Sequence, residues 1–253
     1  MSRRKVGKSL NIAGDTHTHT LACGHAFSTL GENIAAAGAR GHRFLCYTEH
    51  GPAMVKGMNP WFFQNQRRSV PRVVDGIVVL LGCEANILDE TGAMDLSQEL
   101  LGQLDWVIAS LHDTFRPQAE PGPQTIVRAW KAVAQNPYVD CIGHLGNPRM
   151  ACNYETVVRY FKEGDKIVEL NCSSHKVRPG SDATCRQIAA LCKAYGVPMV
   201  LSSDAHFYTD VGEVEWGLNL VRDLEIPEEL ILNLNYDRFC AELKRRRDID
   251  LPR

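Results

Sequence analysis

Histidines and acidic residues stand at short spacings along this 253-residue chain, and these are residue types that bind metal ions. The segment Asp15 to His19 (DTHTH) holds two histidines two residues apart, which puts both rings on one side of an extended chain. Asp204 to His206 (DAH) repeats that geometry near the other end. Because neutral imidazoles and carboxylates suit Zn²⁺, Mn²⁺ and Fe²⁺, the pattern predicts metal binding.

Seven short apolar runs, rich in valine and isoleucine, alternate with helical patterns. This alternation is typical of parallel βαβ units whose strands are covered on both faces. One α/β barrel of about 200–250 residues fits the length, so we expect a single domain over residues 1–253. The predicted strands are Ile12–Asp15, Phe44–Thr48, Ile77–Cys83, Trp106–Ser110, Val139–Gly143, Ile167–Leu170 and Val197–Ser202.

Helical patterns lie between these runs. Thr29 to Glu32 has the form of a capping box, and Gly41 supplies a left-handed stop. Ser181 or Asp182 is predicted to cap a second helix, which Gly196 ends. Further helices are predicted at Gln124–Gln135, Tyr154–Lys162, Val214–Leu224, Glu228–Leu234 and Tyr236 to about Arg246, and an exposed loop at Arg116–Pro123.

Six of the seven predicted strands have a His, Asp or Glu just beyond their C-terminal end, and seven of the nine histidines obey this rule. A parallel barrel brings those ends to one face, where the active sites of such barrels lie. Seven histidines and two carboxylates exceed the four or five ligands of one ion. We therefore expect two or three ions at that face.

Composition disfavours several other classes of protein. Lys and Arg number 28 against 30 Asp and Glu, a net charge of −2, which disfavours a general nucleic-acid or membrane-surface binder. The 44% hydrophobic content disfavours disorder, and nine scattered cysteines without a CxxC pair predict reduced thiols. No apolar stretch of signal length follows the basic segment Met1 to Leu10, and none reaches the ~20 residues of a membrane span. We expect a cytoplasmic protein.

These motifs resemble the PHP (polymerase and histidinol phosphatase) superfamily, and most closely its small stand-alone phosphatases of the YcdX type. The resemblance covers nearly the whole chain. It implies an α/β fold, a distorted seven-stranded (β/α)7 TIM-like barrel with a trinuclear metal site, and a ring-shaped homo-oligomer such as a trimer. The matching segments are Asp15–His19, Thr48–Gly51, Pro71–Gly76, Gly82–Asn86, Ser110–His112, Gly143–His144, Asn171–Ser174, Gly180–Ser181 and Ser203–His206.

The resemblance also implies three divalent ions (Zn, Mn or Fe) and nine ligands, all of which this chain has. Two positions depart from the family. Glu49 replaces the usual Asp, which bears on the orientation of His50, and His175 replaces an apolar residue, which bears on substrate preference. The implied ligands are His17, His19, Glu84 and Asp204 for the first ion, Glu84 (bridging), His112 and His144 for the second, and His25, His50 and His206 for the third.

Several residues near the predicted site have two interpretations. Arg178 could grip a phosphate, with Ser181 at the start of the next helix, or both could belong to a solvated basic loop. Arg149 has the same two interpretations. His175 could contact substrate or solvent, and His25 taken alone would favour a surface role.

Other residues are assigned to structure. His42 precedes the second predicted strand, so we expect it on the opposite face, in a structural or surface role. The basic run Lys244–Arg247 is predicted to be a solvated helix end that suits the helix dipole. The tryptophans are predicted to be core or interface residues: Trp61, Trp106, Trp130 and Trp216.

Three divalent ions and two carboxylates would give the site a charge of about +4, which selects an anionic ligand. We therefore expect hydrolysis of a small phosphomonoester by a metal-bound hydroxide, without a side-chain nucleophile. The alternatives are a phosphodiesterase or nuclease, a histidinol-phosphate phosphatase, and a non-catalytic protein that binds a phosphorylated ligand through its metals. The acidic balance disfavours an extended nucleic-acid partner.

Overall fold

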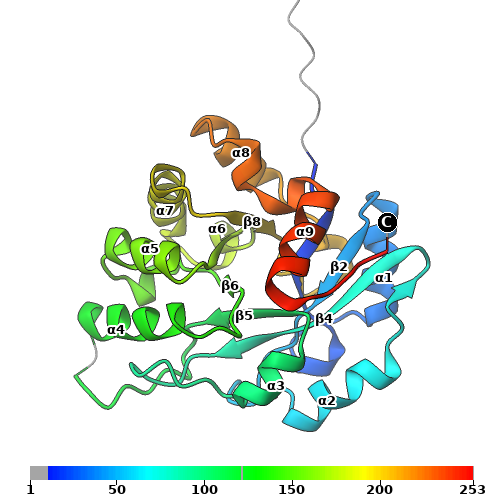
Figure 1. Cartoon of the computed structure of the whole chain (residues 1–253), viewed down its shortest axis with the longest axis horizontal. Coiled ribbons are helices and arrows are strands. Elements are labelled where there is room, and N and C mark those ends of the chain that lie inside the picture. The colour runs from blue at the N-terminus through cyan, green and yellow to red at the C-terminus, as the bar shows by residue number, and fades with distance from the viewer. Residues whose placement is uncertain (1–10, 121, 253) are drawn as a thin grey trace, which may run out of the picture.

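The computed structural model describes residues 11–120 and 122–252, so the basic segment Met1 to Leu10 lies outside the described residues. Seven parallel strands form a nearly closed barrel in the order β1-β2-β4-β5-β6-β7-β8 (Figure 1), and β3 pairs antiparallel with β4. This confirms the predicted seven-stranded barrel. The strands are β1 (Gly14–Thr18), β2 (Phe44–Tyr47), β3 (Val73–Val74), β4 (Ile77–Asn86), β5 (Trp106–Ser110), β6 (Cys141–Ile142), β7 (Ile167–Asn171) and β8 (Met199–Ser202).

Nine α-helices lie within the described part of the chain, and most of them surround the barrel (Figure 1). The predicted capping box is present, because the Thr29 side chain and Glu32 bond each other's backbone N–H groups at the start of α1. None of the described helices is long and apolar enough to cross a membrane. The helices are α1 (Leu30–Ala39), α2 (Pro60–Ser69), α3 (Gln98–Gln103), α4 (Pro123–Ala134), α5 (Tyr154–Glu163), α6 (Ser174–Val177), α7 (Ser181–Tyr195), α8 (Glu215–Asp223) and α9 (Tyr236–Arg247).

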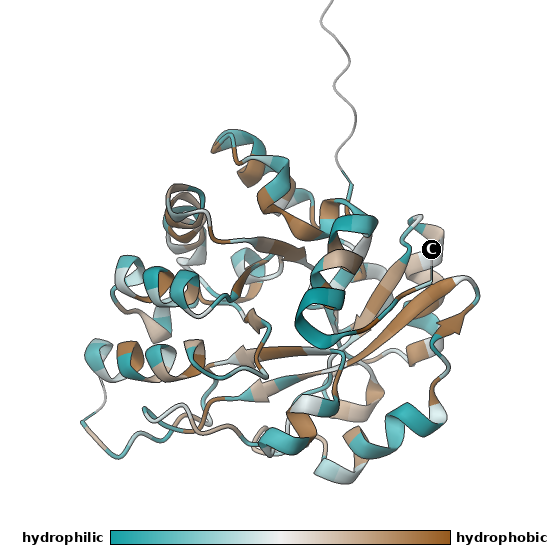
Figure 2. Cartoon of the chain, viewed as in Figure 1, coloured by the Kyte–Doolittle hydropathy of each residue, from teal (hydrophilic) through white to brown (hydrophobic). Residues whose placement is uncertain are grey.

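Apolar side chains fill both the barrel and the layer between barrel and helices. Figure 2 shows the strands as largely hydrophobic and the surrounding helices as mixed. Inside the barrel, Phe239 of α9 stacks on Phe44 with ring centroids 4.2 Å apart and lies 5.5 Å from the Trp106 ring. Helix α9 thus closes the floor of the barrel, at the N-terminal ends of the strands.

The basic end of α9 differs from the prediction, because two of its arginines are buried. The side chains of Arg246 and Arg247 are 7% and 6% exposed. Arg247 donates hydrogen bonds to both carboxylate oxygens of Asp140, just before β6, and to the carbonyl of Leu101. Only the Lys244 end of this run is solvated as expected. These arginines attach α9 to the barrel floor.

The join between β1 and β8 is the weakest in the barrel. Their only described strand pairing is the bridge between Thr18 and Ala205. Below it, the side chain of Asn233 donates to the carbonyls of Gly14 (3.0 Å) and Leu201 (2.7 Å) and accepts from Leu201 N. A side chain therefore completes part of the ring that backbone pairing leaves open.

Several predicted boundaries were wrong. Neither Ser181 nor Asp182 caps α7, because Gly180, with a φ of 90°, precedes the helix in the left-handed region. The segment predicted as a helix at Glu228–Leu234 forms two 3-10 turns, Glu228–Leu230 and Leu232–Leu234. The predicted loop at Arg116–Pro123 is irregular as far as it is described, apart from Pro123, which begins α4. Helices α2, α3 and α6 were not predicted.

The four tryptophans differ in burial. Trp106 and Trp130 are fully buried in the core, as predicted. Trp216 is half-buried and stacks on His175, with centroids 5.1 Å apart and planes 8° apart. Trp61 on α2 is 68% exposed, so it is not a core residue.

Candidate metal centre

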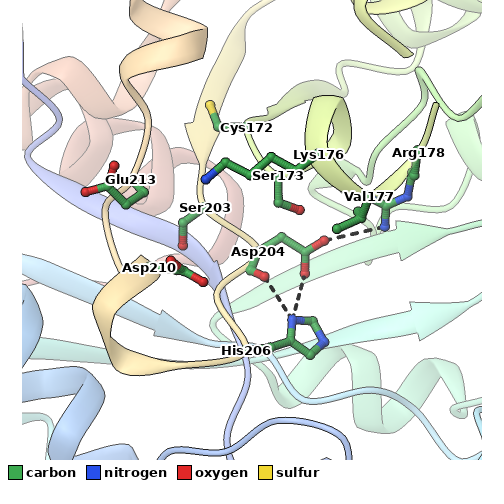
Figure 3. A pocket seen from close by; sticks show the side chains of 10 residues that line it. All are labelled: Cys172, Ser173, Lys176, Val177, Arg178, Ser203, Asp204, His206, Asp210 and Glu213. Carbon is green, nitrogen blue, oxygen red and sulfur yellow. Dashed lines mark hydrogen bonds and ion pairs between the residues drawn. The ribbon is translucent and has the colours of Figure 1, made fainter. Parts of the chain in front are cut away.

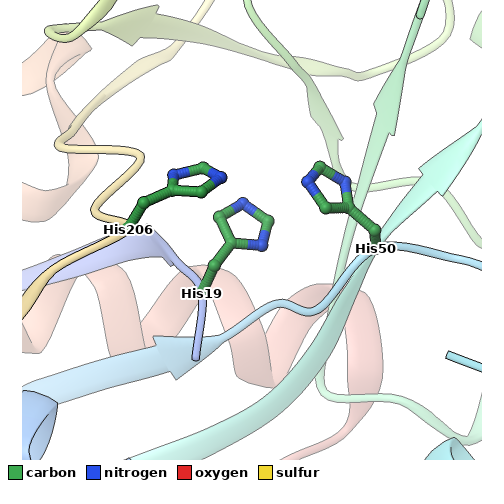
Figure 4. Close-up of side chains that lie close together, drawn as sticks. All are labelled: His19, His50 and His206. Carbon is green, nitrogen blue, oxygen red and sulfur yellow. The ribbon is translucent and has the colours of Figure 1, made fainter. Parts of the chain in front are cut away.

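The nine predicted ligands lie together at the C-terminal ends of the strands. Three of them come from segments far apart in sequence, and their rings gather in one place in Figure 4: His19 after β1, His50 after β2 and His206 after β8. All but His25, His112 and His206 are buried. The clustered residues are His17, His19, His25, His50, Glu84, His112, His144, Asp204 and His206.

Six of these imidazoles form three close pairs. The Nε2 atoms are 3.0 Å apart in the pair His17–His19, and 3.2 Å apart in the pairs His112–His144 and His25–His50. Metal–nitrogen bonds of about 2.0–2.1 Å at tetrahedral angles would separate two ligand nitrogens by about 3.3 Å. The spacing of the two Nε2 atoms in each pair therefore suits one divalent ion bound by both.

Glu84 in β4 lies between two of the pairs and is 1% exposed. Its Oε1 is 2.8 Å from His144 Nε2 and 3.3 Å from His112 Nε2. Its Oε2 is 3.3 Å from His17 Nε2 and 3.5 Å from His19 Nε2. Each oxygen thus faces a different imidazole pair, which is the arrangement of a bridging carboxylate. Glu84 Oε2 also lies 2.8 Å from His50 Nδ1.

The charges in the cluster depend on one another. Burial raises the pKa of the Glu84 carboxyl, but the imidazoles of His17, His50 and His112 outweigh burial and hold that pKa well below its ordinary value. Burial lowers the pKa of His17, but Glu169 and other carboxylates outweigh it, so that pKa is well above its ordinary value. Burial lowers the pKa of His50 to about 3. Buried carboxylates here depend on positive charge, which protons or divalent ions can supply.

Two family models match this chain. The PHP domain model covers residues 15–173, more than half of the chain, and the PHP-associated model covers residues 182–247. The chain belongs to the PHP family. A protein of Caldicellulosiruptor saccharolyticus with the name "Probable phosphatase" is 43% identical over 91% of this PHP chain and 95% of its own length. One of Caldanaerobacter subterraneus, of the same description, is 42% identical over 94% and 93%.

The PHP chain also resembles solved structures in fold. The histidinol phosphate phosphatase of Lactococcus lactis, solved with zinc, L-histidinol and phosphate, superposes with a TM-score of 0.60 over 84% of this chain and 94% of that one. The two sequences are 17% identical, so the likeness concerns the fold alone.

Polar residues behind two of the predicted ligands fix the direction of their rings. Glu169 Oε1 lies 2.6 Å from His17 Nδ1, and Asn86 Oδ1 lies 2.8 Å from His112 Nδ1. Glu169 lies in the predicted strand Ile167–Leu170 and Asn86 ends the matching segment Gly82–Asn86, but no role was predicted for either residue. Position was the available signal, because Glu169 and Asn86 both lie in strand segments that end at the metal face. Such bonds fix the tautomer and orientation of a ligand ring.

Asp204 and His144 carry backbone strain at the site. Their φ angles are 54° and 23°, in a region that side chains other than glycine rarely adopt. The strain aims Asp204 Oδ1 at the His19 Nε2 atom, 3.2 Å away, and the Asp204 carbonyl accepts from His206 Nδ1 at 2.9 Å. Strained backbone of this kind gathers at functional sites.

A pocket of about 360 Å³ opens beside Asp204 and His206. Figure 3 shows Arg178 and Lys176 on one of its walls, with the Arg178 guanidinium turned toward Asp204. Arg178 donates to Ser174 Oγ at 3.0 Å and lies 3.5 Å from Asp204 Oδ2. The pocket therefore joins the candidate metal centre to this basic wall, and the carboxylates of Asp210 and Glu213 also line it.

Ser181, Arg149 and His42, which were also considered from sequence, do not line this pocket. Ser181 is fully buried with an unpartnered Oγ and does not line the pocket. The side chain of Arg149 is 73% exposed and pairs with Asp113. His42 is buried against Gly212, outside the ligand cluster, in agreement with a structural role.

Proposed function

We propose that this chain is a metal-dependent phosphatase that hydrolyses a small phosphomonoester. The observation that carries the proposal is the set of three imidazole pairs, two of which share the Glu84 carboxylate, at the rim of a pocket with a basic wall. The names of the two relatives, both described as probable phosphatases, support the same activity.

The residues fit three divalent ions, one for each imidazole pair. Glu84 and Asp204 would complete the ligands of the first ion, Glu84 would bridge to the second, and His206 would join the third. Bound ions of this kind activate water and neutralise phosphoryl oxygens. Zinc, manganese and iron all suit imidazole-rich ligands.

Two side chains of the pocket, Arg178 and Cys172, bear on the proposed reaction. Arg178, held by Ser174, would bind phosphoryl oxygens and orient the ester toward the metal centre. Cys172 also lines the pocket, but burial raises the pKa of its thiol well above its ordinary value, so it is no nucleophile at neutral pH. The thiol is therefore set aside as a nucleophile, and the proposed attacking group is water activated at the metal centre.

Hydrolysis of p-nitrophenyl phosphate before chelation, after chelation and after return of each metal tests the proposal. We expect loss on chelation and recovery with metal, and unchanged turnover by the metal-free protein would refute it. A panel of nucleotides, sugar phosphates, histidinol phosphate and bis-p-nitrophenyl phosphate separates a monoesterase from a diesterase. Binding of phosphate without turnover under every metal would favour the non-catalytic alternative.

Several predictions from sequence stay predictions. They are the single-domain organisation, the cytoplasmic location, the trimeric assembly, and the contact of Ser181 with substrate.

A further inference from the structure

His19 differs from His17 and His112 at Nδ1, the ring nitrogen that faces away from the paired imidazole. In His17 and His112 that nitrogen, Nδ1, is hydrogen-bonded to Glu169 and Asn86. In His19 the corresponding Nδ1 is buried and has no hydrogen-bond partner. A ligand imidazole in that condition has no fixed tautomer, and an unsatisfied buried nitrogen is costly.

Glu49 faces this nitrogen with an unsatisfied atom of its own. Its Oε1 accepts hydrogen bonds from the backbone N–H (2.7 Å) and hydroxyl (2.5 Å) of Thr20. Its Oε2 is buried without a partner and lies 3.8 Å from His19 Nδ1. The carboxylate was expected to orient His50, but the two unpartnered atoms, Glu49 Oε2 and His19 Nδ1, face each other.

We propose that Glu49 is a positioning residue for His19, and that its Oε2 accepts the Nδ1–H of this imidazole. One proton then satisfies both buried atoms and leaves the lone pair of Nε2 for a metal ion. Thr20 holds the other oxygen of Glu49 in place. From 3.8 Å, Oε2 needs to move less than 1 Å toward His19 Nδ1 to reach hydrogen-bond distance. The inference rests on the metal centre of the proposed function and not on its substrate.

With this assignment, each of the two histidines in the Asp15 to His19 segment has a carboxylate beside its Nδ1 atom. Glu169 lies behind His17, and Glu49 lies behind His19. A carboxylate in that place makes the imidazole a stronger base and therefore a stronger ligand. The thiol of Cys23 is also near, but it is engaged with the Thr20 carbonyl at 3.3 Å.

Zinc affinity of the metal-free protein, measured by chelator competition, tests the proposal with Glu49→Gln. We expect the zinc ion of the His17–His19 pair to bind about 10- to 100-fold less tightly. Glu49→Asp keeps the charge and should fall between the two proteins. Asp105→Asn removes another buried carboxylate, bonded to Arg67 and Arg72 far from the cluster, and should leave zinc affinity unchanged.

Proton–nitrogen correlation spectra of the zinc-loaded protein give a second readout, independent of turnover. They should show His19 with a proton on Nδ1 and zinc on Nε2, and this signal should be lost or shifted in Glu49→Gln. An unprotonated Nδ1, unchanged zinc affinity, or a fourth zinc between His19, Cys23 and Glu49 would overturn the proposal. If Glu49→Gln does not fold, Thr20→Val removes one bond to Oε1 and should weaken zinc binding to a smaller extent.

Neither readout depends on hydrolysis. A protein that binds zinc as described but cleaves no phosphate ester would contradict the proposed function and leave the role of Glu49 standing.

Discussion

His17 and Glu169 are 152 positions apart in the chain, yet His17 Nδ1 lies 2.6 Å from Glu169 Oε1 in a site without solvent exposure. The second oxygen of this carboxylate accepts a hydrogen bond of 2.6 Å from the backbone N–H of His144. One glutamate on β7 therefore positions a ligand in each of two imidazole pairs.

Replacing that glutamate should affect both pairs. In Glu169→Gln, loss of the charged acceptor should weaken metal binding by about 10- to 100-fold, because the His17 ring loses the partner that fixes its tautomer. Metal content after dialysis, measured by elemental analysis, checks this. A variant with full metal content and wild-type turnover would show that the bond has no such role.

The third imidazole group should hold the most exchangeable ion. His25 is exposed and His206 is half-buried, and this group has no carboxylate ligand of its own. We expect His25→Asn to lose one equivalent of metal on dialysis and to keep the other two. Loss of all metal from this variant would contradict the separation of the three groups. His175→Asn, a histidine outside the cluster, is the control.

Metal binding should release protons at pH 7. Burial lowers the pKa values of His17 and His19, but nearby carboxylates outweigh it and hold both pKa values well above the ordinary value, which favours protonated rings in the metal-free protein. A metal ion displaces these protons, and affinity should fall as the pH falls. Calorimetric titration in buffers of different ionisation enthalpy measures the release. Heats that do not vary with the buffer would contradict it.

Replacing Arg178 should weaken the hydrolysis of a phosphate ester and leave metal binding unchanged. We expect Arg178→Ala to lower kcat/KM for a phosphomonoester by about 10- to 100-fold while metal content stays the same. Arg178→Lys should recover little, because a lysine lacks the planar pair of donors. Arg149→Ala, at an exposed arginine, should behave as the wild type, and an equal loss there would point to a general effect of charge.

The stability of the protein should depend on the buried ion pair between Arg247 and Asp140 at the barrel floor. Arg247→Ala leaves Asp140, which is 2% exposed, without its cation, and should lower the free energy of unfolding by about 3–5 kcal/mol. Urea unfolding measures this. Lys244→Ala, on the exposed side of α9, should leave the unfolding midpoint unchanged. A similar loss in both variants would mean that positive charge at the C-terminal end of the helix, and not the buried ion pair, is responsible.

The alternation of apolar runs and helical patterns predicted the barrel, and strand β5 lies where it was predicted, at Trp106–Ser110. The clustering of the predicted ligands could be foreseen because parallel strands end on one face, whatever the details of the loops. The partner of Glu49 could not be predicted, because Thr20, in the loop after the neighbouring strand β1, sets the direction of that carboxylate. Burial of Arg247 depends on where α9 docks, 107 positions from Asp140, and local sequence carries no sign of that.

The loose join between β1 and β8 has a consequence for how the site comes into being. His17 lies in the first strand and His19 directly follows it, whereas Asp204 and His206 follow the last strand. An ion shared by these residues would therefore span the opening of the ring. A nascent chain still lacking its last barrel strand has only half of that ligand set. Metal uptake should therefore coincide with ring closure, and removal of the metal should speed amide exchange first in these two strands.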